Sequence, residues 1–276
     1  MTYQTLSFEK HGPVAVITLD RADAGNSLNM AMAEDLFRAG LECEADIGVR
    51  CVILTGAGRV FCFGGDLKAI SDQENPAGFL NELTAKLHAA ISVFNRMRAP
   101  VIAAVNGAAA GAGVGLLAMA DLALAAEDAK ISLAYTGVAL TPDGSTTYFL
   151  PRLIGRRRTL ELMLTNRPLR AEEACTWGLL NRVVPGDQLM DEAMALAQKL
   201  GAGPVGAFAA TKRLLLSSDD NSLEAQMALE GRTIAAQGHS AEGREGVAAF
   251  LQKREPCPVA LYRRLQLSHN IRTAPT

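Results

Sequence analysis

The sequence predicts an α/β fold in which buried strands run into glycine loops and helices, followed by a helical C-terminal region. Three observations support this prediction. Residues 14–19, 51–55 and 101–105 are short, continuous apolar runs of the kind that form buried strands. Clusters of glycine follow the second and third runs, and helix-forming segments come after each cluster. From about residue 171 onward, the pattern predicts almost only helix.

Turn residues and apolar periodicity place the individual elements. Gly12-Pro13 is a turn signal before the first strand, and residues 76–98 repeat leucine and alanine at helical spacing. The best boundary is Gly201-Ala202-Gly203-Pro204, which predicts a core at 1–200 and a helical region at 201–276. The expected strands are 14–19, 51–55, 101–105, 121–126 and 131–133, and the expected helices are 30–43, 76–98, 112–120, 187–200, 205–216, 222–236 and 241–253.

Composition excludes several classes of protein. The chain has 276 residues, of which 49% are hydrophobic and 20% charged, and this balance is typical of a globular protein. The formal net charge of −2 argues against nucleic-acid binding, which favours a strongly basic surface. No apolar stretch is long enough to span a membrane. The five cysteines lack metal-binding spacing, and the first ten residues lack a secretory pattern, so we expect a cytoplasmic protein.

Two glycine loops, at 61–67 and 106–115, share the same arrangement. Each follows a buried strand, and each can open a helix whose first N–H groups have no partner within the helix. Glycine lets such N–H groups approach a ligand closely. The glycine spacing of the second loop does not match a dinucleotide-binding fingerprint. Spacing alone leaves open whether these loops bind a ligand or are tight turns.

The sequence resembles the crotonase, or enoyl-CoA hydratase/isomerase, superfamily. The segments that carry the resemblance appear in the family's order along nearly the whole chain; they are 54–67, 100–113, 150–155, 171–179 and 245–254, together with Asp20-Arg21-Ala22 and Asn26-Ser27-Leu28. The resemblance implies a spiral of ββα turns with a helical C-terminal region that forms homotrimers or hexamers. It also implies an acyl-CoA substrate, with coenzyme A as part of that substrate, no prosthetic group and no metal.

The resemblance implies roles for the loop residues. The backbone N–H groups of Gly65 and Ala112 would bind the thioester oxygen and stabilise an enolate. Other residues would bind the coenzyme A part. These are Ala22 and Ala24 near the adenine, Asp66, Leu67 and Lys68 along the pantetheine channel, and Lys253 with Phe250 near the phosphates.

The acid and base groups differ from those of the family's hydratases. The two glutamates of those enzymes fall on Gly115 and Tyr135 by motif register, so both carboxylates are missing. Asp143 is a carboxylate in a Pro-Asp-Gly segment, where the family's isomerases can carry a single acid. We therefore predict an enoyl-CoA isomerase in which Asp143 moves a proton between two carbons.

Three alternatives remain. In a hydratase, Asp143 would act with Tyr135 or His88 to place water. In a relative of 4-chlorobenzoyl-CoA dehalogenase, which the segment 161–167 resembles, Asp143 would be the nucleophile and His88 its helper. A non-catalytic relative would bind only CoA esters or RNA. Cys62, in the first glycine loop, is predicted to be structural because no histidine is adjacent.

Overall fold

The main sheet has six strands and forms the centre of the body. A computed structural model of the protein describes residues 2–256. The strand order is β1-β2-β3-β5-β7-β10, and all neighbours are parallel except the antiparallel pair β1–β2. The bounds are Leu6–His11 for β1, Val14–Leu19 for β2, Cys51–Gly56 for β3, Val101–Val105 for β5, Leu122–Ala126 for β7 and Arg182–Val184 for β10.

A second, smaller sheet has the order β4-β6-β8-β9. Its strands are β4 (Val60–Cys62), β6 (Ala108–Ala110), β8 (Lys130–Ser132) and β9 (Leu169–Arg170). Along the chain, a strand of the main sheet is followed by a strand of the small sheet and then by helix, in the series β3-β4-α2, β5-β6-α4 and β7-β8-α5. This repetition confirms the predicted ββα turns.

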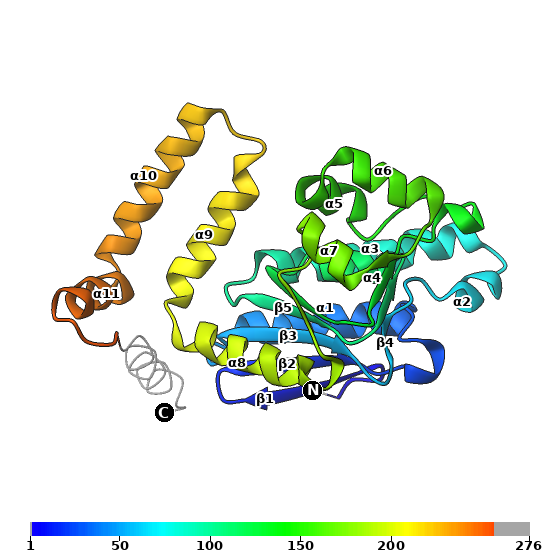
Figure 1. The fold of residues 1–276 in the computed structure, drawn as a ribbon, viewed down its shortest axis with the longest axis horizontal. Coiled ribbons are helices and arrows are strands. Elements are labelled where there is room, and N and C mark those ends of the chain that lie inside the picture. The colour runs from blue at the N-terminus through cyan, green and yellow to red at the C-terminus, as the bar shows by residue number, and fades with distance from the viewer. Residues whose placement is uncertain (1, 257–276) are drawn as a thin grey trace, which may run out of the picture.

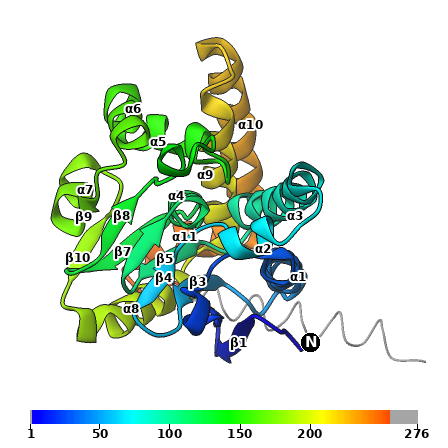
Figure 2. The ribbon, with the colours of Figure 1, turned by 90° about the vertical axis from the view of Figure 1, so that its right-hand side faces the viewer.

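Helices cover both faces of the main sheet (Figures 1 and 2). In β3, Cys51 and Ile53 pack with α8, whereas Val52 and Leu54 pack with the cluster that includes α1 and α3. Burial on both faces explains why this strand is apolar throughout. The helices of the body are α1 (Met30–Ala45), α2 (Leu67–Ser71), α3 (Pro76–Arg96), α4 (Ala112–Ala118), α5 (Thr146–Ile154), α6 (Arg156–Thr165), α7 (Ala171–Trp177) and α8 (Leu189–Ala202), with short 3-10 turns at η1 (Ala22–Ala24), η2 (Thr136–Val138) and η3 (Gly186–Gln188).

Three helices extend away from the body at the C-terminal end (Figure 1). They are α9 (Val205–Ser218), α10 (Leu223–His239) and α11 (Ala241–Leu251). The connection into α9 is held by buried Arg50, whose guanidinium donates to the backbone oxygens of Gly201 and Gly203. The segment predicted as a boundary is therefore tied to the start of β3.

The predicted strands and helices are found, and the region after residue 171 is almost only helical, as predicted, with β10 as an added strand of the main sheet. The short strands β4, β6 and β9 of the smaller sheet were not expected. Strand β1 was not expected at all. It pairs with β2 at an exposed edge, and its charged residues at 9 and 10 hide the strand pattern. Cys257 and the rest of the region to residue 276 lie outside the described residues.

Candidate active site

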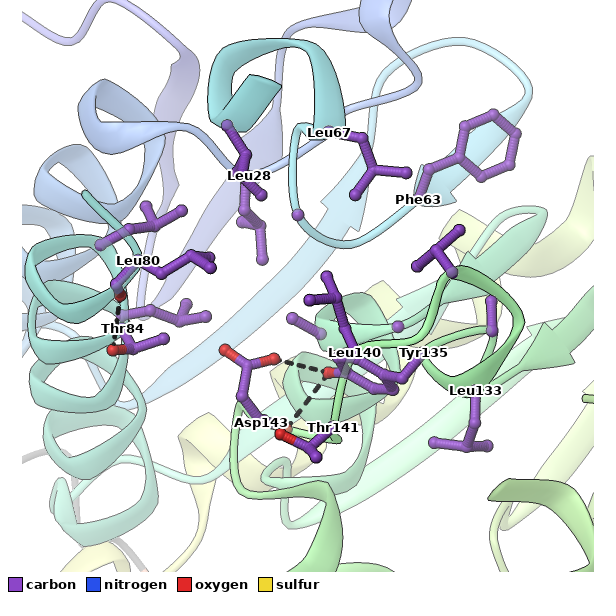
Figure 3. A pocket seen from close by; sticks show the side chains of 18 of the residues that line it. Leu28, Phe63, Leu67, Leu80, Thr84, Leu133, Tyr135, Leu140, Thr141 and Asp143 are labelled. Carbon is purple, nitrogen blue, oxygen red and sulfur yellow. Dashed lines mark hydrogen bonds between the residues drawn. The ribbon is translucent and has the colours of Figure 1, made fainter. Parts of the chain in front are cut away.

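A pocket of about 310 Å³ lies where the two glycine loops meet α3 and the segment after β8 (Figure 3). Most of its lining is aliphatic, and Asp143 is the one carboxylate among the lining residues. The lining consists of Leu28, Phe63, Gly65, Leu67, Ile70, Leu80, Asn81, Leu83, Thr84, Leu87, Gly111, Ala112, Leu133, Ala134, Tyr135, Val138, Leu140, Thr141 and Asp143. An apolar pocket with few polar groups is the usual setting for a small-molecule site.

Close backbone packing brings the two glycine loops together. Gly64 has a φ of +85°, which favours glycine. A Cβ atom there would lie 2.7 Å from the carbonyl oxygen of Ala110 and 3.0 Å from the backbone nitrogen of Ala112. The first loop is fixed on its other side by Leu28, which donates to Gly64 O at 2.7 Å and accepts from Asp66 N at 3.0 Å. Only glycine at position 64 permits this approach.

The backbone N–H groups of Gly65 and Ala112 are available to a ligand. Both residues line the pocket, and Ala112 is the first residue of α4, where a helix leaves its N–H groups without internal partners. Within residues 2–256, neither N–H donates a hydrogen bond to a protein acceptor. The geometry thus provides two donors on one pocket wall, as the sequence predicts, but their role in binding a thioester oxygen stays a prediction.

Asp143 is held by Tyr135 (Figure 3). The Tyr135 hydroxyl donates to Asp143 Oδ1 at 2.7 Å and lies 3.2 Å from the backbone oxygen of Asp143. Burial raises the pKa of the Tyr135 hydroxyl far above its ordinary value, and the neighbouring Asp143 carboxylate raises it further. Tyr135 therefore stays protonated and remains a donor at physiological pH.

The backbone next to Asp143 occupies the position where the family's hydratases would carry a glutamate. A Cβ atom on Gly115 would lie 2.0 Å from the carbonyl oxygen of Gly144. Any side chain at position 115 would therefore displace the segment that carries Asp143. The close packing of Gly115 against Gly144 therefore excludes a glutamate at position 115 and, at the same time, fixes the segment that carries Asp143.

His88 lies on α3 and does not line the aliphatic pocket, but it lines a neighbouring cavity together with Asp143. Its Nε2 accepts a hydrogen bond from Gly144 N–H at 3.3 Å, and its ring faces a neighbouring, more polar cavity. His88 therefore contacts the backbone that follows Asp143 rather than the carboxylate. The structure brings Gly65, Ala112, Tyr135 and Asp143 together in one pocket, with His88 behind it.

The predicted pantetheine-binding residues differ in their surroundings. Leu67 lines the pocket mouth and is exposed, and Lys68 is exposed on α2. Asp66 is engaged within the protein, because it caps α2 through Ala69 N–H and forms an ion pair with Arg21 at 2.9 Å. Burial alone would raise the pKa of Asp66, but these two partners outweigh burial and hold the pKa below its ordinary value.

The remaining predicted binding residues lie outside the pocket lining. Ala22 and Ala24 are exposed on η1, close to the first glycine loop. Phe250 is exposed on α11, which extends away from the body (Figure 1), and Lys253 lies just after the end of that helix. Within this one chain, the structure does not bring Phe250 and Lys253 to the pocket.

Cys62 is a buried, inert thiol. Its Sγ donates to Asn26 O at 3.2 Å, and burial raises its pKa to about 12. A thiol with such a pKa is protonated at neutral pH and is a poor nucleophile. Across residues 2–256 there is no cluster of three or more histidine, cysteine or acidic side chains that could hold a metal, and no helix is long and apolar enough to cross a bilayer.

The sequence did not identify the aliphatic residues that line the pocket. Leu80, Leu83 and Leu87 belong to the apolar face of α3, which indicates only a buried helix face. Leu133, Val138 and Leu140 come from an irregular segment without periodicity. Only the closeness of these three residues to Tyr135 and Asp143 in the sequence indicated that they could line the site.

Comparisons with known proteins identify the family and the fold. The model of the enoyl-CoA hydratase/isomerase family matches residues 9–257. A probable enoyl-CoA hydratase of Rhodobacter capsulatus is 41% identical over 257 residues, which cover 93% of this chain and 98% of the relative. The 1,2-epoxyphenylacetyl-CoA isomerase of Escherichia coli is 38% identical, with 88% and 94% covered. The crystal structure of an enoyl-CoA hydratase from Bacillus anthracis superposes with a TM-score of 0.87 at 32% identity, over 92% of this chain and 98% of that one.

Proposed function

The chain belongs to the enoyl-CoA hydratase/isomerase family, and from this premise we propose that it is an enoyl-CoA isomerase that moves a double bond in a coenzyme A thioester. The observation that carries the proposal is the single carboxylate, Asp143, in a pocket with two backbone donors. A paired-glutamate hydration site is not available, because Gly115 packs on Gly144 and position 135 is a tyrosine.

The proposed reaction needs only one base. The Asp143 carboxylate removes a proton from the α-carbon of a 3-enoyl-CoA, and the C–H electrons form a dienolate with its negative charge on the thioester oxygen. The N–H groups of Gly65 and Ala112 stabilise that charge. Protonated Asp143 then delivers the proton to the γ-carbon, which yields the 2-enoyl-CoA and restores the carboxylate.

The coenzyme A part would extend from the pocket along the first glycine loop. In this proposal Leu67 and Lys68 flank the pantetheine arm and Ala22 and Ala24 approach the adenine. Asp66 contributes by fixing the start of α2, given its ion pair with Arg21. Phe250 and Lys253 would act on the site of a neighbouring subunit in a homotrimer or hexamer, since they lie away from this chain's own pocket.

The test is turnover of a 3-enoyl-CoA by Asp143→Asn. This variant keeps the shape of the side chain and the hydrogen bond from Tyr135 but removes the base. We expect kcat to fall by about 10²- to 10⁴-fold, the usual contribution of general acid–base catalysis. Binding of the thioester, measured by calorimetry, should change little. An Asp143→Asn variant as fast as the wild type would contradict the proposal.

Hydration of a 2-enoyl-CoA is the second candidate, and the names of several relatives favour it. It would require Asp143, with Tyr135 or His88, to place a water molecule. Crotonyl-CoA distinguishes the two reactions, because rapid water addition without isomerisation would favour the hydratase. The assay panel should also include 1,2-epoxyphenylacetyl-CoA, the substrate named for the Escherichia coli relative, because the aliphatic pocket could hold a ring as well as a chain.

A further inference from the structure

We propose that Tyr135 is a positioning residue that fixes which oxygen of Asp143 acts as the base, an inference that rests on the proposed function of Asp143. The two side chains are eight residues apart in an irregular segment, yet their oxygens lie 2.7 Å apart. The proposal assigns Oδ1 to the hydrogen bond with Tyr135 and Oδ2 to proton transfer.

The tyrosine proton points to the carboxylate rather than to the backbone. The hydroxyl has one proton and two nearby acceptors, Asp143 Oδ1 at 2.7 Å and Asp143 O at 3.2 Å. The backbone oxygen already accepts from the Thr146 hydroxyl at 2.8 Å and from Thr146 N–H at 3.2 Å. The shorter contact to a charged acceptor is also the stronger one.

The second oxygen of Asp143 is left for the substrate. Among the described residues, Oδ2 accepts no hydrogen bond. The carboxylate extends into the pocket (Figure 3), so a fixed Oδ1 restricts the rotation of the carboxylate and holds Oδ2 in one direction. A base that serves two carbons in turn must keep one orientation through both transfers, and small misplacements of such a group are costly.

The Tyr135 ring is itself held rigidly. Its backbone nitrogen donates to Leu133 O at 2.7 Å, and its backbone oxygen accepts from the N–H groups of Val138 and Leu140 at 3.1 and 3.0 Å. The ring packs against the main core. By motif register, position 135 is where the family's hydratases carry their second glutamate. In this chain that position instead supplies a hydrogen-bond donor to the Asp143 carboxylate.

The test compares Tyr135→Phe with the wild type on a 3-enoyl-CoA. Loss of the hydroxyl should lower kcat by about 10- to 100-fold, because the carboxylate is no longer held. KM should stay within about twofold, because the ring and the thioester donors remain. The separation of kcat from KM is the readout, because a packing defect that distorts the pocket would raise KM as well.

Tyr148→Phe is the matched control. Tyr148 lies on α5 outside the aliphatic pocket, and its hydroxyl donates no hydrogen bond within the described residues, so its loss should alter neither kcat nor KM. If Tyr135→Phe retains wild-type kcat while Asp143→Asn is impaired, the positioning role is wrong and the isomerase proposal stands. A lower kcat with a KM raised in the same proportion indicates a packing role and also contradicts it. An inactive wild type, or a fully active Asp143→Asn, overturns both proposals.

Discussion

The predicted thioester donors are backbone N–H groups, not side chains. Ala112 would donate through its main chain, and its own methyl group lies beside Gly144, where a Cβ would be 3.2 Å away. Deleting or retaining that methyl does not change the donor. The chemistry at residue 112 therefore depends on the start of α4 and only weakly on the residue type.

Replacing Ala112 with proline removes this donor while preserving the helix. Proline is well tolerated at the first position of a helix, and the preceding Gly111 accepts the restriction that proline imposes. We expect kcat for thioester isomerisation to fall by about 10²- to 10³-fold, the effect of one lost oxyanion donor. Ala112→Gly is the control, because it keeps the N–H and should remain close to wild type. Similar losses in both variants would assign the effect to packing instead.

At the scale of residues, the positions of Gly65 and Ala112 could be predicted because they follow strands with a clear pattern, whereas positions that depend on irregular backbone could not. The structure places Gly65 and Ala112 on one pocket wall. The Tyr135–Asp143 hydrogen bond could not be foreseen, because the segment between them includes Ala139 in a left-handed conformation. A residue in this conformation redirects the chain without leaving a periodic pattern. The sequence therefore does not show which way the side chains on either side of it point.

At the scale of elements, α2 depends on one residue at its start. Asp66 accepts from Ala69 N–H at 3.1 Å and pairs with Arg21, and α2 has only five residues to stabilise it. Because α2 places Leu67 and Ile70 in the pocket wall, the cap supports the site as well as the fold. The ion pair also connects α2 to the segment that leads into η1.

Asp66→Ala should lower the free energy of unfolding by about 1–2 kcal/mol at neutral pH, the usual cost of a lost helix cap and a small contribution from the ion pair. The pKa of Asp66 is lower in the folded protein than its ordinary value of 3.8. Its stabilisation is therefore present above that value and is lost as the pH falls through the folded pKa. Urea denaturation at pH 7 and pH 3 should show the difference between wild type and Asp66→Ala shrinking in acid. Asp66→Asn, which can still cap the helix, should cost less at pH 7; an equal cost would contradict the capping role.

The elements themselves were predictable where burial produces a pattern. Strands β2, β3 and β5 are almost entirely apolar because helices cover both faces of the main sheet, and these strands were all predicted. Strand β1 was missed since it lies at a solvent-exposed edge, and β10 because three residues are too few to show a period. Burial is what gives a strand a recognisable apolar pattern. Short or exposed strands therefore show little pattern in the sequence.

The whole molecule presents apolar side chains that one chain does not cover. Within the described part of the chain, α10 has no buried residue, and large hydrophobic side chains are exposed along the extended helices. These exposed side chains are Leu215, Leu223, Met227, Ile234, Val247, Phe250 and Leu251. Exposed apolar side chains that gather in this way are typical of a protein–protein contact. The trimer or hexamer that the family resemblance implies would cover them.

We expect the purified protein to sediment as a trimer or hexamer of the 29.2 kDa chain. Ile234 on α10 is 74% exposed, and Ile234→Glu would place a charge in the contact, so it should shift the mass toward that of a monomer. Leu164→Glu is the control, because Leu164 is similarly exposed at 68% but lies on α6 of the body, away from the extended helices. Analytical ultracentrifugation at micromolar concentration measures the mass of both variants.

If Phe250 and Lys253 complete a neighbour's coenzyme A site, Ile234→Glu should also raise KM for the thioester while Leu164→Glu leaves it unchanged. A wild-type monomer that retains full affinity for the thioester would contradict both the assembly and the shared site.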